Sequence, residues 1–238
     1  MKRLLAGVMV LLSGLLFAIP SYAATLQVFP VNIGFCAGEN AQAIYVKNSG
    51  SSAIGAQIRV YAWQQQNNKD ILSETDELLV SPPMTTIPAT RQQLIRVILP
   101  APVTGNNEKA YRLIVDELPG ENNLAEKDGV RFLLRYSIPV FVNCNDRQPD
   151  PKTISFSVDS QAHPAMLKVR NTGPQHIKLS DITLLSGGKK IHMSHGLLGY
   201  VLPHSEKEWP LPKGVSHASS LSLNLNDNEQ EQTFSITP

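Results

Sequence analysis

The chain has 238 residues, a formal net charge of +1 and no long run of like charges. This balance excludes the basic surface that a nucleic-acid backbone requires, and it excludes a charged disordered tail. The length fits a short leader followed by two domains of about 100 residues each.

The first 23 residues have the order of a secretory signal peptide. Lys2 and Arg3 give a positive start, residues 4–19 form an apolar run, and small residues lead to a cleavage site at Ala23. A membrane-spanning helix needs about 20 apolar residues, and this run is shorter and is followed by Pro20. We therefore predict a cleaved leader, no membrane span, and a mature chain of net charge −1 outside the cytoplasm.

Apolar residues alternate with polar ones along most of the first half, which predicts short β-strands. A weak local helix is expected only near residues 75–79, and residues 64–70 form a polar stretch. The expected strands cover residues 25–35 (with Pro30 inside), 41–47, 56–63, 78–81, 93–99, 110–118 and 129–142.

A polar segment at residues 145–150 carries Pro149 and predicts a linker between two domains. A second series of alternating segments follows, so we expect an all-β chain of two sandwiches, at residues 24–145 and 146–238. The second series of strands covers residues 152–158, 165–170, 176–183, 189–193, 206–211, 221–225 and 232–236.

The chain has two cysteines, Cys36 and Cys144. Export from the cytoplasm favours a disulfide between them, which would close most of the first domain. The alternatives are two free thiols or a metal pair, but two cysteines without a neighbouring histidine make a poor zinc site.

No catalytic signature is present: the sequence lacks a nucleophile elbow, a phosphate-binding glycine loop and a zinc-protease helix motif. Asp116 and Glu117 are adjacent on an expected strand and point to opposite faces. His192 and His195 are three apart, which on a strand also places them on opposite faces, so we predict no metal site there. We expect neither an enzyme nor a bound cofactor.

The segment at residues 129–142 is the longest expected strand. Val130, Phe132 and Leu134 lie on one face of it, and a polar loop precedes it. The simplest interpretation is a core strand. The alternative is an edge strand that pairs with a strand of a partner protein, whose pockets take the alternate side chains.

Several segments in order resemble the periplasmic chaperones of the chaperone–usher pilus pathway, in a divergent branch such as the archaic one. Two segments of the second domain, Asn-Thr-Gly (171–173) and Leu-Asn-Asp (225–227), look like turns of that family. In the first domain the resemblance covers Val-Phe-Pro-Val-Asn-Ile (28–33), Ser-Pro-Pro (81–83), Gln-Leu-Ile-Arg-Val (93–97), Tyr-Arg-Leu-Ile-Val-Asp-Glu-Leu-Pro (111–119) and Arg-Tyr-Ser-Ile-Pro-Val-Phe (135–141).

The resemblance implies two immunoglobulin-like sandwiches set at an angle, in the periplasm. It implies that pilus subunits bind in the cleft and along the last strand of the first domain, about residues 129–142. That strand would complete the open sandwich of a subunit with Val130, Phe132 and Leu134, and an outer-membrane usher would then receive the subunit. No cofactor is implied.

This chain departs from the family where the better-known branch carries two cations that hold the carboxylate of the subunit. Asn32 and Pro139 stand at those positions. Arg91 and Arg135 are other cations of the domain, but strand geometry brings three more towards the cleft. The candidate anchors are therefore Arg96, Lys109 and Arg112.

A second departure is Asn143, where the family often has an arginine that pairs with acids like Glu117 and Asp227. We expect a reduced interdomain salt-bridge network, with the cysteine bridge bracing the same region. Two further functions stay open from the sequence: a secreted structural or adhesive two-domain protein without chaperone activity, and an enzyme on a sandwich scaffold.

Overall fold

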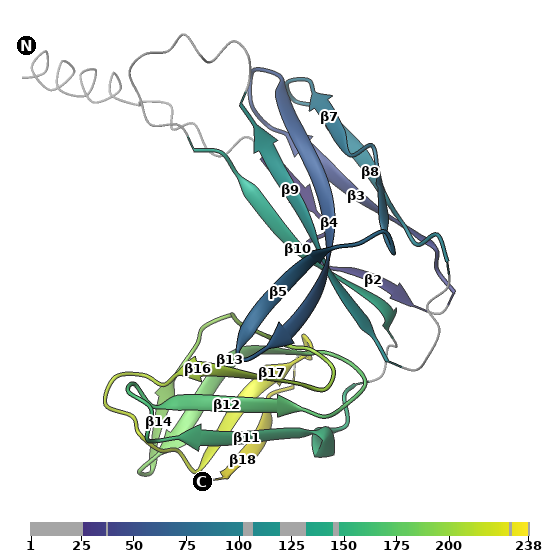
Figure 1. Ribbon diagram of the computed structural model, residues 1–238. Helices are drawn as coiled ribbons and strands as arrows, with labels where there is room; N and C mark the ends of the chain where they lie inside the picture. The colour runs from purple at the N-terminus through teal and green to yellow at the C-terminus, as the bar shows by residue number, and fades with distance from the viewer. Residues whose placement is uncertain are drawn as a thin grey trace, which may run out of the picture.

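A computed structural model describes residues 26–36, 38–101, 107–119, 132–144, 148–228 and 230–237. The described residues form β-strands and one 3-10 helix, Pro151–Thr153, which follows the linker. Figure 1 shows two all-β domains that meet at an angle, with the second domain below the lower ends of β4, β9 and β10. The expected fold class, two immunoglobulin-like sandwiches set at an angle, is confirmed.

The first domain is a sandwich of two sheets. One sheet has the order β1-β3-β8-β6, and the other has the order β2-β10-β9-β4-β5, with β7 also paired to β4. The strands are β1 (Leu26–Phe29), β2 (Ile33–Cys36), β3 (Ala41–Asn48), β4 (Ile54–Gln66), β5 (Lys69–Glu74), β6 (Leu79–Ser81), β7 (Met84–Ile87), β8 (Gln92–Ile98), β9 (Lys109–Leu118) and β10 (Arg135–Cys144).

The expected first strand, residues 25–35, is two strands in two different sheets. β1 pairs with β3 in one sheet, and β2 pairs with β10 in the other. Pro30 lies between them and lacks the N–H that a continuous ladder would use. The chain therefore crosses from one layer to the other at residues 30–32 and leaves each short strand at a different edge.

The second domain is also built from antiparallel strands, and its two layers are joined through β18. That strand pairs with β17 antiparallel and with β11 parallel. The strands are β11 (Ile154–Asp159), β12 (Met166–Asn171), β13 (Ile177–Ser186), β14 (Lys189–His192), β15 (Leu197–Val201), β16 (Ser205–Pro210), β17 (Ser220–Leu225) and β18 (Gln232–Thr237).

Three strands were missed by the sequence pattern: β5, β7 and β15. All residues of β5 are exposed, so it has no buried face and shows no apolar alternation. The weak helix expected near residues 75–79 is wrong, because this segment bends and leads directly into β6.

Each domain has its own apolar core, formed by the inward-facing residues of its strands. A buried asparagine is the last residue of one strand in each domain, Asn48 of β3 and Asn171 of β12. In both cases Nδ2 donates to main-chain oxygens of the neighbouring loops, while Oδ1 accepts the N–H of a glycine two residues on. These turns satisfy buried polar groups that would otherwise destabilise the loop.

Among the described residues, none belongs to a helix with the length and apolarity needed to cross a membrane.

Candidate functional site

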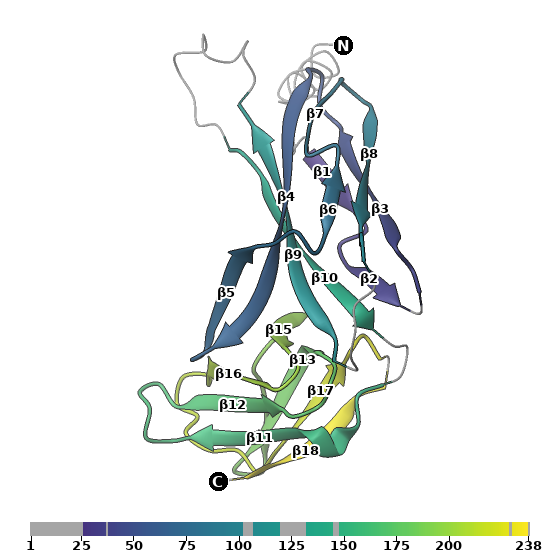
Figure 2. The same cartoon turned by 45° about the vertical axis from the view of Figure 1, so that its right-hand side comes forward.

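β10 has one edge that is only partly paired. β9 pairs with its inner edge from Arg135 to Val142, but β2 pairs with the other edge only from Val140 to Cys144. Within the part of the chain that the structure describes, no strand covers this outer edge at residues 135–139. We call residues 132–139 the upper segment and residues 140–144 the lower segment. Figures 1 and 2 show β10 running from its upper end down to the second domain.

The upper segment presents main-chain groups at this free edge. The N–H of Glu117 donates to the carbonyl oxygen of Leu134 at 2.9 Å, so residue 134 points its peptide groups towards β9. Because this pattern alternates along an antiparallel pair, residues 135, 137 and 139 point theirs away from β9. Pro139 offers only its carbonyl oxygen, so the donors at the edge are the N–H groups of Arg135 and Ser137.

Side chains on one face of the upper segment become more exposed from its lower to its upper end. Ile138 is buried in the core, Leu134 and Tyr136 are half-buried against it, and Phe132 is 81% exposed. The Tyr136 hydroxyl donates to the carbonyl oxygen of Leu26 at 2.7 Å, which bridges the gap between β10 and β1. The same apolar face therefore begins inside the domain and ends in solvent.

The predicted strand 129–142 differs in its bounds from β10, which begins at Arg135 and ends at Cys144. Of the predicted donor residues, Phe132 and Leu134 lie just before the strand, and Val130 lies outside the described residues. The period-two pattern placed Leu134 on the same face as core residues, as observed, but it did not predict the residue at which pairing begins.

The lower segment is closed on both sides. β2 pairs with it in parallel, and Ile33 and Phe35 of β2 are buried in the core. Cys36 and Cys144 form the predicted disulfide, beside Gly34. A side chain at Gly34 would approach the sulfur of Cys144 to 3.1 Å, so this position favours a small residue.

The start of β10 is held to β9 by charge. Asp116 accepts hydrogen bonds from Arg135 and from Arg59, the latter at 2.6 Å. Burial raises the pKa of Asp116, but the hydrogen bonds and charges of Arg135 and Arg59 outweigh it, and the pKa lies below its usual value. Asp116 is on the outer face of the sheet and Glu117 on the buried side, as expected.

A small aromatic cluster lies where the domains meet. Trp63, Ala110 and Phe141 of the first domain pack against Tyr200 and Leu202 of the second. The Arg112 guanidinium lies 3.7 Å from the centre of the Trp63 ring and 5.6 Å from the centre of the Tyr200 ring.

The Arg112 side chain donates no hydrogen bond to any residue that the structure describes. Burial lowers the pKa of Arg112 from its usual value, and the electrostatic effects of Tyr200 and Asp70 offset this only in part.

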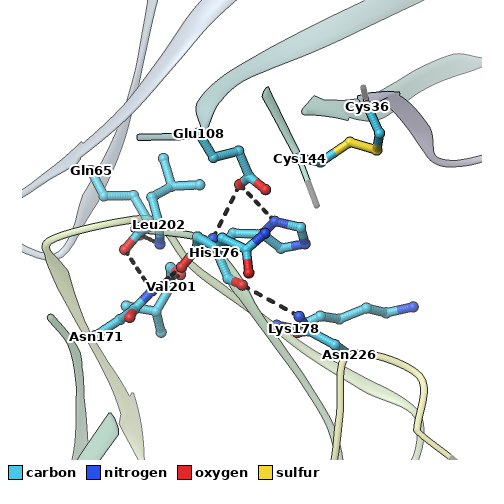
Figure 3. Close-up of polar contacts among 11 residues, drawn as sticks. Cys36, Gln65, Glu108, Cys144, Asn171, His176, Lys178, Val201, Leu202 and Asn226 are labelled. Atoms are coloured by element: carbon cyan, nitrogen blue, oxygen red, sulfur yellow. Dashed lines mark hydrogen bonds and ion pairs between the residues drawn. A yellow bond between two sulfur atoms is a disulfide. The ribbon is translucent and has the colours of Figure 1, made fainter. Parts of the chain in front are cut away.

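Polar contacts cross the same interface (Figure 3). The ring Nδ1 of His176 lies 2.7 Å from Oε1 of Glu108, and the main-chain N–H of His176 donates to the same oxygen. The Gln65 side chain donates to the carbonyl oxygen of Tyr200 and accepts the N–H of Leu202. The two domains are therefore joined by several directed contacts.

The other two candidate anchors lie elsewhere. Arg96 is exposed on β8, which belongs to the sheet that does not contain β10. Lys109 forms an ion pair with Glu77 at 2.6 Å, and Glu77 also accepts the Tyr111 hydroxyl. The structure does not bring the three cations together, and Arg112 is the one that stands at the domain interface without a hydrogen-bonded acid among the described residues.

An open cavity of about 670 Å³ lies between the domains beside β4 and β5. Both domains line it, with Trp63, Gln65 and Glu77 on one side and Leu202 and His204 on the other. No described residue of β10 lines this cavity, so it is separate from the upper segment.

The two acids that the family resemblance named, Glu117 and Asp227, have other partners in this structure. Glu117 is buried at the upper end of β9, where its carboxylate accepts the N–H of Leu134, while Asp227 pairs with Lys178 at 2.5 Å. Asn143 donates to the carbonyl oxygen of Asn107 instead of contacting either acid. Sequence reasoning missed Glu108 and His176, because two residues 68 positions apart in different domains give no local pattern.

His192 and His195 do not point to opposite faces as expected. Their rings stack with centroids 5.1 Å apart, because β14 ends at His192 and the chain turns before His195. Among the described residues, no third His, Cys, Asp or Glu joins them in a group that could hold a metal ion.

Family models match both domains. The model described as the pili and flagellar-assembly chaperone PapD N-terminal domain matches residues 25–146. The model described as the pili assembly chaperone PapD C-terminal domain matches residues 149–228. The chain belongs to the family of pilus-assembly chaperones. These chaperones are not enzymes, which confirms the expectation from the sequence.

Solved structures of this chaperone family resemble the chain along most of its length. The chaperone CsuC from the archaic Csu pili of Acinetobacter baumannii, solved with the tip subunit CsuE, is 27% identical with a TM-score of 0.68, and the match covers 90% of this chain and 98% of that one.

The chaperone SafB of Salmonella enterica, solved with the pilin SafA, is 18% identical with a TM-score of 0.66, over 91% and 98% of the two chains. The E. coli chaperone DraB is 18% identical with a TM-score of 0.61, over 90% and 97%. No curated protein sequence matches the chain.

Proposed function

We propose that the chain is a periplasmic chaperone that binds pilus subunits by donor-strand complementation and delivers them to an outer-membrane usher. The observation that carries the proposal is the upper segment of β10, where a free main-chain edge adjoins an apolar face that leaves the core at Phe132. An edge of this kind invites pairing with another chain. The proposal includes export by a signal peptide at residues 1–23 and domains at residues 24–145 and 146–238.

In this mechanism the subunit is a sandwich that lacks one strand, and the upper segment completes it. The main-chain donors and acceptors of residues 135 and 137 bond to the subunit main chain. Val130, Phe132 and Leu134 enter the open core of the subunit. Full burial of each such side chain contributes about 1.5–3 kcal/mol. Leu134 is already half-buried, so Phe132 gains more on binding than Leu134 does.

Among the three candidate cations, Arg112 is best placed to hold the C-terminal carboxylate of the subunit. Arg112 lies opposite Pro139 in the β9–β10 register, where the free edge ends. It is also a partly buried cation without a bonded anion, and a carboxylate would supply that anion. Lys109 already has Glu77, and Arg96 belongs to the other sheet.

The test is Phe132→Asp, with Leu133→Asp as the matched control. Each protein is co-expressed with a pilus subunit from the same gene cluster, and the amount of subunit co-purified is measured. Phe132→Asp places a charge in the apolar core of the subunit, so we expect capture to fall more than about tenfold. Leu133 is a neighbouring exposed leucine on the opposite face, so capture should stay within about twofold of wild type. Equal capture by both variants would rule out donor-strand binding.

The anchor is tested by Arg112→Gln beside Arg96→Gln in the same assay. Loss of a charge-assisted bond to a carboxylate should weaken capture about tenfold for the first variant and leave the second unchanged. If the Arg96 variant has the larger effect, the anchor belongs to the other sheet.

A further inference from the structure

His176 occupies a slot in the first domain. The residue comes from the second domain, just before β13, and its imidazole lies between a carboxylate and a phenyl ring of the first domain (Figure 3 shows the carboxylate side). On one side, Nδ1 is 2.7 Å from Oε1 of Glu108. On the other, the ring stacks on Phe141 with centroids 3.5 Å apart and planes 3° apart.

Glu108 depends on this contact. Its side chain is only 1% exposed, and a buried carboxylate requires hydrogen-bond donors. Among the described residues, both donors to its carboxylate come from His176, through the ring and through the main-chain N–H. The N–H of Glu108 in turn donates to the carbonyl oxygen of Pro174 at 2.9 Å. Separation of the domains at this point would strip the carboxylate of both partners.

His176 also contacts the strand that follows the upper segment. Phe141 belongs to the lower segment of β10, directly below Pro139. A second set of interdomain contacts comes from the long hairpin of β4 and β5, where Gln65 bonds to the main chain of Tyr200 and Leu202 and Asn68 accepts hydrogen bonds from Lys207 and Glu208. Two separate sets of contacts fix an orientation, whereas one set alone would allow rotation about it.

We propose that His176 is a positioning residue: by inserting between Glu108 and Phe141 it sets the angle between the domains and holds β10 in the orientation in which a subunit binds. The claim about subunit binding rests on the proposed chaperone function. The claim about the domain angle concerns the chain without a subunit and does not depend on that function. The C-terminal domain thus orients the donor strand through His176, although it forms no part of the free edge.

The experiment compares three variants of the full mature chain with wild type. His176→Ala removes the bond and the stacking, His176→Phe keeps the stacking but removes the ring donor, and Glu108→Gln keeps an acceptor for Nδ1. His192→Ala is the control, because this exposed histidine lies away from the interface. Domain orientation is measured by small-angle X-ray scattering, and local opening by hydrogen exchange of the Glu108 and His176 amides.

We expect His176→Ala to raise amide exchange at Glu108 and His176 by about tenfold or more, because a buried charged group loses a partner. The scattering radius should increase, since the contacts of the β4–β5 hairpin that remain let the domains rotate. His176→Phe should open nearly as much, and Glu108→Gln, which keeps the acceptor but loses the charge, should open less than either. Dissociation of the subunit complex should accelerate about tenfold for the first two variants, less for Glu108→Gln, and remain unchanged for the control.

Different results overturn different claims. If His176→Ala lowers the melting temperature but leaves scattering, amide exchange and dissociation unchanged, His176 is a structural residue of its own domain and the positioning role is wrong. If His176→Ala behaves like wild type while Phe132→Asp abolishes capture, the chaperone function stands and the positioning role falls. If Phe132→Asp leaves capture intact, the donor-strand function falls, and scattering of the free chain still decides the domain angle.

Discussion

The upper segment continues directly into the lower segment, yet the two have different environments. In the lower segment Val140 to Val142 pair with a strand on each side and are buried, and the disulfide and His176 fix this part of β10. In the upper segment one edge is free and Phe132 stands in solvent. A strand that pairs with a partner protein needs both an accessible part and a rigid part. The accessible part forms the new pairing, and the rigid part keeps the strand in its own domain.

The comparison is tested most directly by truncating the same side chain in each segment. Phe141→Ala should destabilise the protein by about 3–5 kcal/mol, because it removes a buried ring and leaves a cavity at the domain interface. Phe132→Ala should change stability by less than about 0.5 kcal/mol, because its ring is exposed and makes little packing.

Chemical denaturation of both variants provides the measurement. The two domains can unfold separately, so a single free energy of unfolding is only approximate. The expected difference in stability between the two variants is large enough to be seen without a multistate analysis. A comparable loss from both substitutions would mean that the upper segment is part of the core, and the distinction between the segments would not hold.

The disulfide should have the next largest effect, and in the folded protein it joins the lower segment to β2. Cys36 and Cys144 are 108 positions apart, and replacing both with alanine removes a constraint on the unfolded first domain. We expect a loss of about 2–4 kcal/mol in the first domain. In wild type treated with a reducing agent the disulfide is broken but both sulfur atoms remain. This sample is therefore the control for the packing that the alanine substitutions remove.

The double variant should nevertheless keep β2 on the lower segment, because Ile33 and Phe35 remain buried. Amide exchange at Phe141 should therefore stay slow under native conditions. Rapid exchange there would show that the disulfide, and not the packing of β2, closes this edge, and the free edge would then extend below Pro139.

Much of the fold followed from the period-two pattern, and the failures have physical causes. Strands with one buried face, such as β12 and β17, were predicted within one residue at each end. β5 was missed because an exposed edge strand has no buried face to impose alternation. The split of residues 25–35 into β1 and β2 depends on which sheet each half joins, and a local pattern does not contain that information.

The candidate site was predictable only where it is local. The face that holds Phe132 and Leu134 follows from alternation, and Cys36 and Cys144 follow from their number and the expected export. Arg112 could be named only as one of several cations, since its position above Trp63 and near Tyr200 depends on the domain angle. The pair of Glu108 and His176 needed the assembled structure for the same reason.

The smallest expected effect concerns the attachment of the upper segment to β9. The pKa of Asp116 is lowered in the folded state, so its contribution to stability is present above the unfolded aspartate pKa of about 3.9 and disappears as the pH falls through the folded value. Asp116→Asn should remove this dependence. The difference between wild type and the variant should therefore be constant above about pH 5 and shrink below about pH 4.

Thermal melting of the two proteins across this pH range measures the difference, which should also shrink in high salt because Arg135 is exposed. Glu77 has a lowered pKa too, but it titrates equally in both proteins and cancels in the comparison. If the two proteins show the same pH dependence, Asp116 does not hold the start of β10. The hydrogen bonds between Leu134 and Glu117 would then be the attachment, and the upper segment would be held by its paired edge instead of by charge.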